Sequence, residues 1–173
     1  DDNVTHVDGS VDPVRDKEII DTELQIRDLE TIDSRIAKVQ KQAQTGGDKQ
    51  ARLAYEVYLK YKTALEQGLS ARTVQFDTKD EQHIARELFL LTDKPVMYVC
   101  NVDEKSAVEG NKYVEMVREA VRDENAEVLV LAAKTEAEIA ELDDYDERQM
   151  FLAEIGLQES GVARLIKSAY ALL

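Results

Sequence analysis

The stretch that decides the fold is KPVMYVCNVDE, residues 94–104. It holds an unbroken apolar run over residues 96–100 and turns polar at Asn101. A strand that is apolar at every position is typical of a parallel sheet, because such a strand is buried on both of its faces. The stretch therefore predicts a buried parallel strand that ends in a polar loop over residues 101–109.

The sequence that follows predicts a partner for this strand. Residues 111–124 place apolar side chains at helical spacing, and a second apolar run, VLVL, occupies residues 128–131. Strand, loop, helix and strand in this order are typical of a parallel βαβ unit. Because two strands cannot stand alone as the core of a doubly wound domain, we expect the chain to be part of a larger α/β domain.

Upstream of the first strand, the apolar residues follow heptad spacing in two segments separated by Gly46-Gly47. Asp12-Pro13 is typical of a helix start, because Asp caps free amides and Pro tolerates the first helical position. Gly68 ends the second segment. Two such seams predict an antiparallel helical hairpin. The seams consist of Leu29, Ile32, Ile36, Val39 and Ala43, and of Ala51, Ala54, Tyr58, Tyr61 and Leu65.

The segments on either side of the βαβ unit carry weaker patterns. Residues 70–77 are polar and β-prone, and residues 79–91 predict a helix. The tail, residues 134–173, predicts helices with a solvated face over its acidic run, residues 136–147. The core contacts expected in the tail are Leu152, Ile155, Leu165, Ile166 and Tyr170.

Charge and composition limit the classes of function. A net charge of −14 argues against nucleic-acid binding by the surface as a whole. Between residues 35 and 62, however, seven basic residues stand against two acidic ones, a local charge of +5. We therefore predict that this end of the hairpin contacts RNA, such as that of the ribosome, with a solvated coiled coil as the alternative. The contact residues we expect are Arg35, Lys38, Lys41, Lys49 and Arg52.

The single cysteine, Cys100, has no partner for an internal disulfide and lies within the apolar run, where it is expected to be a core residue. No apolar stretch approaches the roughly 20 residues needed to cross a bilayer, and no signal peptide is evident. These features predict a cytoplasmic protein without a membrane contact.

Two short loops follow the two apolar runs. In open α/β sheets the ligand site lies beyond the carboxyl ends of the strands. The first base loop, residues 101–104, and the second base loop, residues 132–134, occupy the places of the NKxD and SAK loops of Ras-like GTPases. By local pattern alone, a turn residue at Asn101 and a solvated acid at Glu104 are equally good interpretations.

Longer segments resemble the Obg-like ATPase (YchF) family of Ras-like P-loop NTPases, and the resemblance covers essentially the whole chain. In that family a coiled-coil arm is inserted into a Ras-like domain. Its base loop has N-x-x-E in place of NKxD, a change that goes with a preference for ATP over GTP. The segments that carry the resemblance are NVTHVDGSVDPVRDKEIIDTEL (3–24), KPVMYVCNVDE (94–104), GNKYVE (110–115), AELDDYDE (140–147) and GLQESGVARLI (156–166).

The resemblance implies a division of the chain and a set of base contacts. Residues 15–68 would form the inserted helical arm, and residues 1–14 with 69–173 would form the C-terminal half of the nucleotide-binding domain. Asn101 would bond the adenine through its side chain, and Val102 would contact the base through its backbone and apolar surface. Glu104 would set the preference for adenine. Ala132, Ala133 and Lys134 would pack on the other side, with Ala132 standing where Ras-like proteins often have Ser.

Other motifs of the family are not found in this sequence. There is no G-x-x-x-x-G-K-[ST] motif, so neither a phosphate cradle nor a Ser or Thr for Mg²⁺ is present. The resemblance implies a fragment without the P-loop and the C-terminal TGS-type domain. The intact protein would bind and hydrolyse ATP, or GTP, with Mg²⁺, whereas the chain alone, without catalytic residues or metal ligands, is expected to be inactive. The alternative is a non-catalytic coiled-coil module that docks a protein or ribosomal partner.

Overall fold

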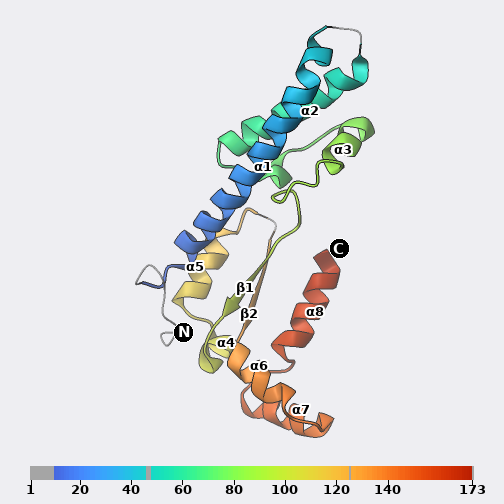
Figure 1. The fold of residues 1–173 in the computed structure, drawn as a ribbon. Coiled ribbons are helices and arrows are strands. Elements are labelled where there is room, and N and C mark those ends of the chain that lie inside the picture. Colours follow the sequence, from blue (N-terminus) through green and yellow to red (C-terminus); the bar gives the residue numbers. More distant parts are fainter. Residues whose placement is uncertain (1–9, 46–47, 125, 173) are drawn as a thin grey trace. The chain divides into compact units, whose positions relative to one another are not determined.

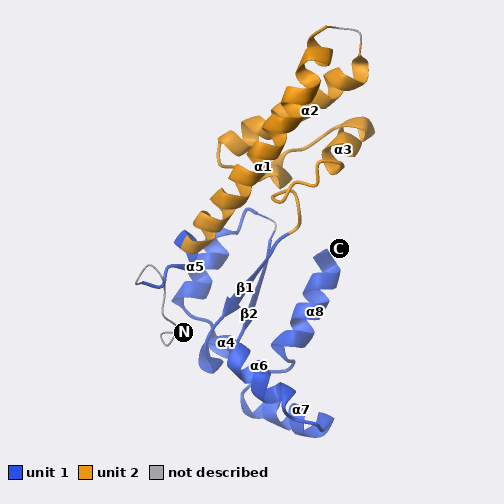
Figure 2. Ribbon diagram, in the orientation of Figure 1, with its two compact units in different colours: residues 1–15, 96–173 blue, residues 16–95 orange. Residues whose placement is uncertain are grey.

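The computed structural model describes residues 10–45, 48–124 and 126–172. The chain forms two compact units, unit 1 over residues 1–15 and 96–173 and unit 2 over residues 16–95 (Figures 1 and 2). This boundary differs from the division expected from the resemblance, because residues 69–95 pack within unit 2. The assignment of a nucleotide-binding part and an inserted arm stays a prediction.

Unit 1 contains the parallel pair that the apolar runs predict. Strand β1, Met97–Asn101, pairs with strand β2, Glu127–Leu131, with Met97 opposite Glu127 and Asn101 opposite Leu131. Helix α5, Lys112–Ala120, lies in the connection between them and buries Val114 and Val117. The predicted strand, helix and strand are therefore confirmed, with α5 ending four residues before the expected end at residue 124.

The prediction of a polar loop over residues 101–109 is wrong for its last six residues. Residues Glu104–Glu109 form helix α4. Asp103 caps this helix, because its Oδ1 accepts the Ser106 N–H at 2.9 Å. Gly110 follows with a φ of 75°, a conformation that glycine adopts without strain, and it separates α4 from α5. The prediction missed the helix because a six-residue helix is too short to show an apolar periodicity.

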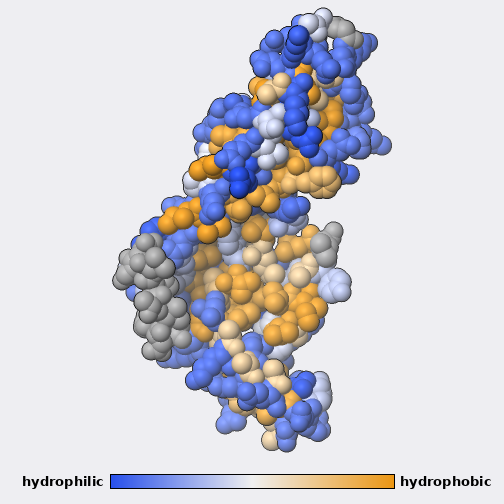
Figure 3. All heavy atoms as spheres, in the orientation of Figure 1, coloured by the Kyte–Doolittle hydropathy of each residue, from blue (hydrophilic) through white to orange (hydrophobic). Residues whose placement is uncertain are grey.

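The sheet of unit 1 is less covered than an entirely apolar strand predicts. Val99 is 48% exposed, and Cys100, expected in the core, is only half-buried. In Figure 3 hydrophobic residues gather over the strands and α8, Gly161–Leu172. Burial on both faces needs a layer of helices on each face, and the described part of the chain leaves Val99 open.

The helical tail is confirmed, but two of its expected core contacts are wrong. Helices α6, Ala133–Ala140, and α7, Tyr145–Glu154, precede α8. Leu152 is buried, and Ile155 and Leu165 are half-buried. Ile166 and Tyr170 are instead 52% and 77% exposed. They lie on α8, whose first residue, Gly161, is the one that the structure buries.

Unit 2 is built on the predicted helical hairpin. Helix α1, Pro13–Gln44, begins after Asp12, whose Oδ1 accepts the Arg15 N–H at 3.1 Å. Helix α2, Lys49–Glu66, begins after Asp48, which accepts the Ala51 N–H at 3.0 Å. The Gly46-Gly47 turn lies outside the described residues. Gly68 follows α2 with a φ of 74°, as a helix-ending glycine does.

The two heptad seams are buried to different extents. Every residue of the second seam is buried, whereas only Ile32 of the first seam is buried. The difference arises because α2 is covered on more than one side. Val57, outside the predicted seam, is also fully buried, and Tyr61 packs edge-on against Phe76 with ring centroids 5.1 Å apart.

The segment between the hairpin and β1 differs from its prediction. Residues 70–77 form no strand; they contain the short 3₁₀ helix η1, Ala71–Thr73. Helix α3, Lys79–Arg86, ends five residues before the expected end at residue 91. Phe89 then adopts a φ of 51°, which turns the chain so that Leu88 and Leu90 are both buried. The local periodicity did not reveal this turn, because tertiary packing imposes it.

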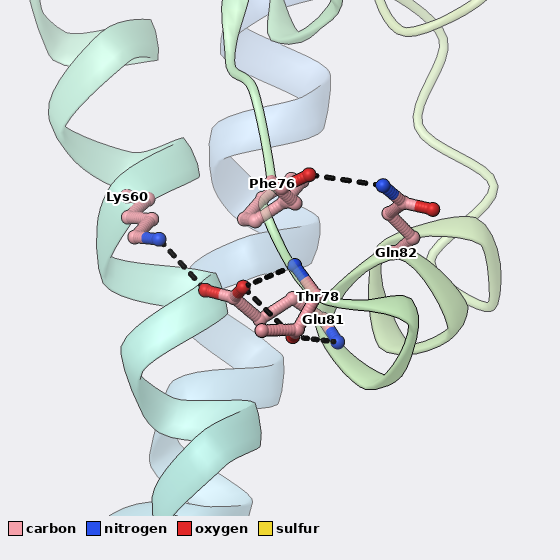
Figure 4. A network of polar contacts seen from close by, with 5 residues as sticks. All are labelled: Lys60, Phe76, Thr78, Glu81 and Gln82. Carbon is pink, nitrogen blue, oxygen red and sulfur yellow. Dashed lines mark hydrogen bonds and ion pairs between the residues drawn. The ribbon is translucent and has the colours of Figure 1, made fainter.

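A polar network fastens the start of α3 to α2 (Figure 4). The Glu81 carboxylate accepts hydrogen bonds from Lys60 Nζ at 2.7 Å, Thr78 Oγ1 at 2.9 Å and the Thr78 N–H at 3.1 Å. Thr78 Oγ1 in turn accepts the Glu81 N–H at 3.2 Å, which completes a capping box. The hydrogen bond from Lys60, followed by those from Thr78, lowers the pKa of Glu81 to about 2.

The Glu81→Gln change should reveal this network through the pH dependence of stability. The folded protein lowers the pKa of Glu81 from its ordinary 4.5, so the carboxylate stabilises the fold above that pH and loses its effect as the pH falls towards about 2. We expect the free energy of unfolding of the wild type to exceed that of E81Q near neutral pH. The difference should shrink below about pH 4.5. Urea unfolding at a series of pH values measures it.

The control for this experiment is Asp80→Asn, which removes an exposed charge from the same first turn of α3. The difference in free energy of unfolding between D80N and the wild type should vary less with pH than the difference between E81Q and the wild type. A difference between wild type and E81Q that is constant across the acid range would contradict the assigned network.

Candidate nucleotide-base site

The two base loops leave the same end of the sheet. Because β1 and β2 run parallel with Asn101 opposite Leu131, the residues that follow both strands meet at their carboxyl ends. Asn101 Oδ1 accepts the Ala133 N–H at 2.9 Å, and the Val102 N–H donates to the Leu131 carbonyl at 2.9 Å. The side-chain bond therefore joins the two loops, and the backbone bond joins the first base loop to the end of β2.

The Asn101 side chain has a structural task that the sequence did not indicate. Its amide oxygen is engaged with the second base loop, while the side chain as a whole is exposed. An Asn amide also carries two N–H donors, which can meet a ring nitrogen acceptor of a base. The arrangement can thus hold the two loops together and still present a donor to a ligand.

In the first base loop, the acidic residues have different environments. Asp103 Oδ1 accepts the Ser106 N–H and its Oδ2 accepts the Ser106 hydroxyl at 2.8 Å. The backbone bond from Ser106, and then the hydroxyl bond, lower the pKa of Asp103 below its ordinary value. Glu104 lies in the first turn of α4 and is exposed, and Val102 is half-buried. The capping role of Asp103 was not predicted, although Asp is among the residues preferred at a helix N-cap.

The second base loop opens helix α6. Ala132 is buried at 3% exposure and precedes the helix without a side-chain cap bond. Ala133 and Lys134 are exposed, and Lys134 Nζ lies 4.0 Å from Glu138 Oε1. The six predicted base-site residues are therefore brought to one end of the sheet, where the loops offer backbone groups together with the charged side chains of Asp103, Glu104 and Lys134.

The predicted arm residues are all exposed in unit 2: Arg35, Lys38, Lys41, Lys49 and Arg52. Arg52 Nε forms an ion pair with Glu56 at 3.2 Å. The other two bases of the local charge count, Lys60 and Lys62, are paired with Glu81 at 2.7 Å and Asp33 at 2.6 Å. The count of +5 therefore overstates the charge available to a partner at this end of the hairpin.

The described residues provide neither a metal site nor a membrane-spanning helix. In the part of the chain that the structure describes, no group of three or more His, Cys, Asp or Glu side chains is placed to hold a metal ion. Among the same residues, no helix combines the length and the apolar character that crossing a membrane requires.

Known proteins match the chain over its whole length. No family model matches it. The "Ribosome-binding ATPase YchF" of Bacillus subtilis is 48% identical over 175 residues, covering 100% of the chain and 47% of that protein. The protein of the same name from Escherichia coli O157:H7 is 42% identical over 172 residues, covering 99% and 46%. "Obg-like ATPase 1" of Rattus norvegicus is 36% identical over 177 residues, covering 100% and 44%.

A solved structure confirms the fold class. The Schizosaccharomyces pombe YchF GTPase superposes with a TM-score of 0.87 at 23% identity, covering 100% of the chain and 47% of that protein. The chain is thus an α/β part of a P-loop NTPase fold with a helical arm, as the sequence predicted. It spans about half the length of the curated relatives it matches. With the whole chain aligned to these relatives at 48%, 42% and 36% identity, the chain belongs to the Obg-like ATPase (YchF) family.

Proposed function

We propose that the chain supplies adenine recognition and an RNA-contacting helical arm to a ribosome-associated protein that binds and hydrolyses ATP. The observation that carries the proposal is the bond between Asn101 and Ala133, which joins the loops after β1 and β2 into one surface. Relatives that match the whole chain are named ribosome-binding ATPase, which supports both halves of the proposal.

Adenine recognition follows from the chemistry of the first base loop. Guanine recognition by an NKxD loop needs a carboxylate that accepts two N–H bonds at a fixed reach. Glu104 is one methylene longer than Asp and lies exposed in the first turn of α4, so the paired geometry is lost. Adenine needs no such carboxylate, because its pairing edge offers a ring acceptor beside an exocyclic amine. The Asn101 amide can donate to such an acceptor.

Hydrolysis is proposed for the whole protein. Phosphoryl transfer depends almost entirely on positioning the phosphates and stabilising their charge. The sequence contains no phosphate-binding loop motif, and the described residues include no group of three or more His, Cys, Asp or Glu side chains placed to hold a metal ion. The chain's own residues are therefore assigned to holding the base. Mg²⁺, when bound to the whole protein, would neutralise phosphate charge.

Titration of the full-length protein with ATP and with GTP tests the proposal. A guanine in this site would leave polar groups unpaired, at a cost of about 1–3 kcal/mol, or roughly 5- to 150-fold in affinity. We expect ATP to bind more tightly by a factor within this range. Glu104→Asp should recover part of the GTP affinity, because it restores the shorter carboxylate. Val102, where the guanine motif has Lys, keeps the recovery incomplete.

The matched control is Glu109→Asp, the same change at the exposed far end of α4. It should leave both affinities unchanged. Equal affinity for the two nucleotides in the parent protein, or tighter binding of GTP, would show that the first base loop does not select adenine.

A further inference from the structure

The carboxylate of Glu136 holds the start of another helix. Glu136 lies in the first turn of α6, within the acidic run that was expected to be a solvated face. Instead, its Oε1 accepts the Gly161 N–H at 2.6 Å and its Oε2 accepts the Val162 N–H at 3.1 Å. These are amides of the first turn of α8, which have no partner within their own helix. A negative charge at this end also interacts favourably with the helix dipole.

The contact between α6, β2 and α8 is close. Gly161 is buried, and a Cβ built on it would lie 2.7 Å from Leu131 Cβ and 2.8 Å from Glu136 Oε1. Cβ atoms essentially never lie so close to another heavy atom, so only glycine fits here without a shift. Leu131 is the last residue of β2 and directly precedes the second base loop. The start of α8 therefore packs directly against the end of β2, where the second base loop begins.

Glu136 is also bonded to the second base loop through its backbone. The Glu136 N–H donates to the Ala132 carbonyl at 2.9 Å, and the Ala133 N–H is held by Asn101. Ala132 provides no side-chain cap to α6. The second base loop is therefore held by Asn101 on the side of the first base loop and by Glu136 with α8 on the other side.

We propose that Glu136 is a positioning residue for the adenine site. By fixing α6 against the start of α8, it holds the second base loop in the place where Asn101 can bond to it. This proposal rests on the proposed base site and assigns that site a second support. Without the Glu136 carboxylate, the loop can move away from Asn101, and hydrogen bonds to a base tolerate displacements of only about 0.5 Å.

The experiment compares Glu136→Ala and Glu136→Gln in the full-length protein. Affinities for ATP, GTP and tripolyphosphate, which has no base, are measured together with thermal unfolding. We expect E136A to weaken ATP binding roughly 3- to 30-fold and to reduce the ratio of ATP to GTP affinity. Tripolyphosphate binding should be unchanged. E136Q keeps the size of the side chain and one acceptor oxygen. Its ratio of ATP to GTP affinity should therefore stay closer to the parent value than that of E136A.

The control is Glu141→Gln, which changes an exposed acid at the other end of α6 and should leave the ratio at the parent value. A parent protein without preference for ATP would overturn the base site and the role of Glu136 with it. A parent with that preference, together with Glu136 variants that keep the parent ratio, would leave the base site standing and overturn the positioning role alone. E136Q provides this comparison even when E136A fails to fold.

Discussion

Replacing Asp28 with Ala is expected to lower the free energy of unfolding of the chain by about 3–5 kcal/mol. Asp28 lies on α1 at 2% exposure. Its carboxylate accepts the N–H groups of Leu91 and Thr92 and the hydroxyl of Thr92, each at 2.7 Å. Alanine would leave two backbone donors and one hydroxyl without an acceptor in the interior of unit 2.

The hydrogen bonds that depend on Asp28 extend beyond Leu91 and Thr92 to the 3₁₀ helix η1. Thr92 Oγ1 accepts the Ala71 N–H at 2.9 Å, and the Thr92 carbonyl accepts the Arg72 N–H at 3.1 Å. Asp28 thus fixes Thr92, and Thr92 fixes the start of η1. Removing the carboxylate loosens both segments at once, because Asp28 is the acceptor for both the Thr92 hydroxyl and the Thr92 N–H.

Urea unfolding followed by circular dichroism measures the effect. The control is Asp33→Ala, also on α1, which removes an exposed ion pair with Lys62 and should cost about 1 kcal/mol or less. Asp28→Asn keeps one acceptor oxygen, so its loss in free energy of unfolding should lie between those of D28A and D33A. A loss for D28A no larger than that for D33A would disprove the assigned network.

The second large effect is expected at the helical arm. Changing Lys38, Lys41 and Arg52 to Glu alters the charge of this exposed surface by six units. If the arm contacts phosphates, binding of the full-length protein to ribosomal RNA should weaken at least about tenfold. The slope of log affinity against log salt should fall by about 3, one for each phosphate that a basic side chain no longer neutralises. The fold should be retained, since among the described residues Arg52 is the only one of the three with an ion pair to give up, the exposed one with Glu56.

Co-sedimentation with ribosomes at several salt concentrations measures the binding. A triple reversal of Lys105, Lys112 and Arg122, which are exposed in unit 1, makes the same change in net charge away from the arm. It should alter binding less. Equal losses in the two variants would indicate a general charge effect, and unchanged binding in the arm variant would remove the arm from the interface.

The sequence by itself determined the elements whose signals are local. The strands lie within one residue of their predicted positions, because an unbroken apolar run between polar residues is visible without any knowledge of the fold. The start of α1 and the burial of the second heptad seam are also confirmed, since caps and heptads act over a few residues. Parallel pairing then sufficed to place both base loops at one end of the sheet.

Only the tertiary structure decided which polar residues are buried and which apolar residues stay exposed. Asp28 bonds to residues 63 and 64 positions away, and Glu136 bonds to a residue 25 positions away. In the sequence both are acids in charged helices, which local patterns assign to a solvated face. Tyr170 matches an apolar helix pattern yet is exposed, because burial depends on what packs over a helix and not on the helix itself.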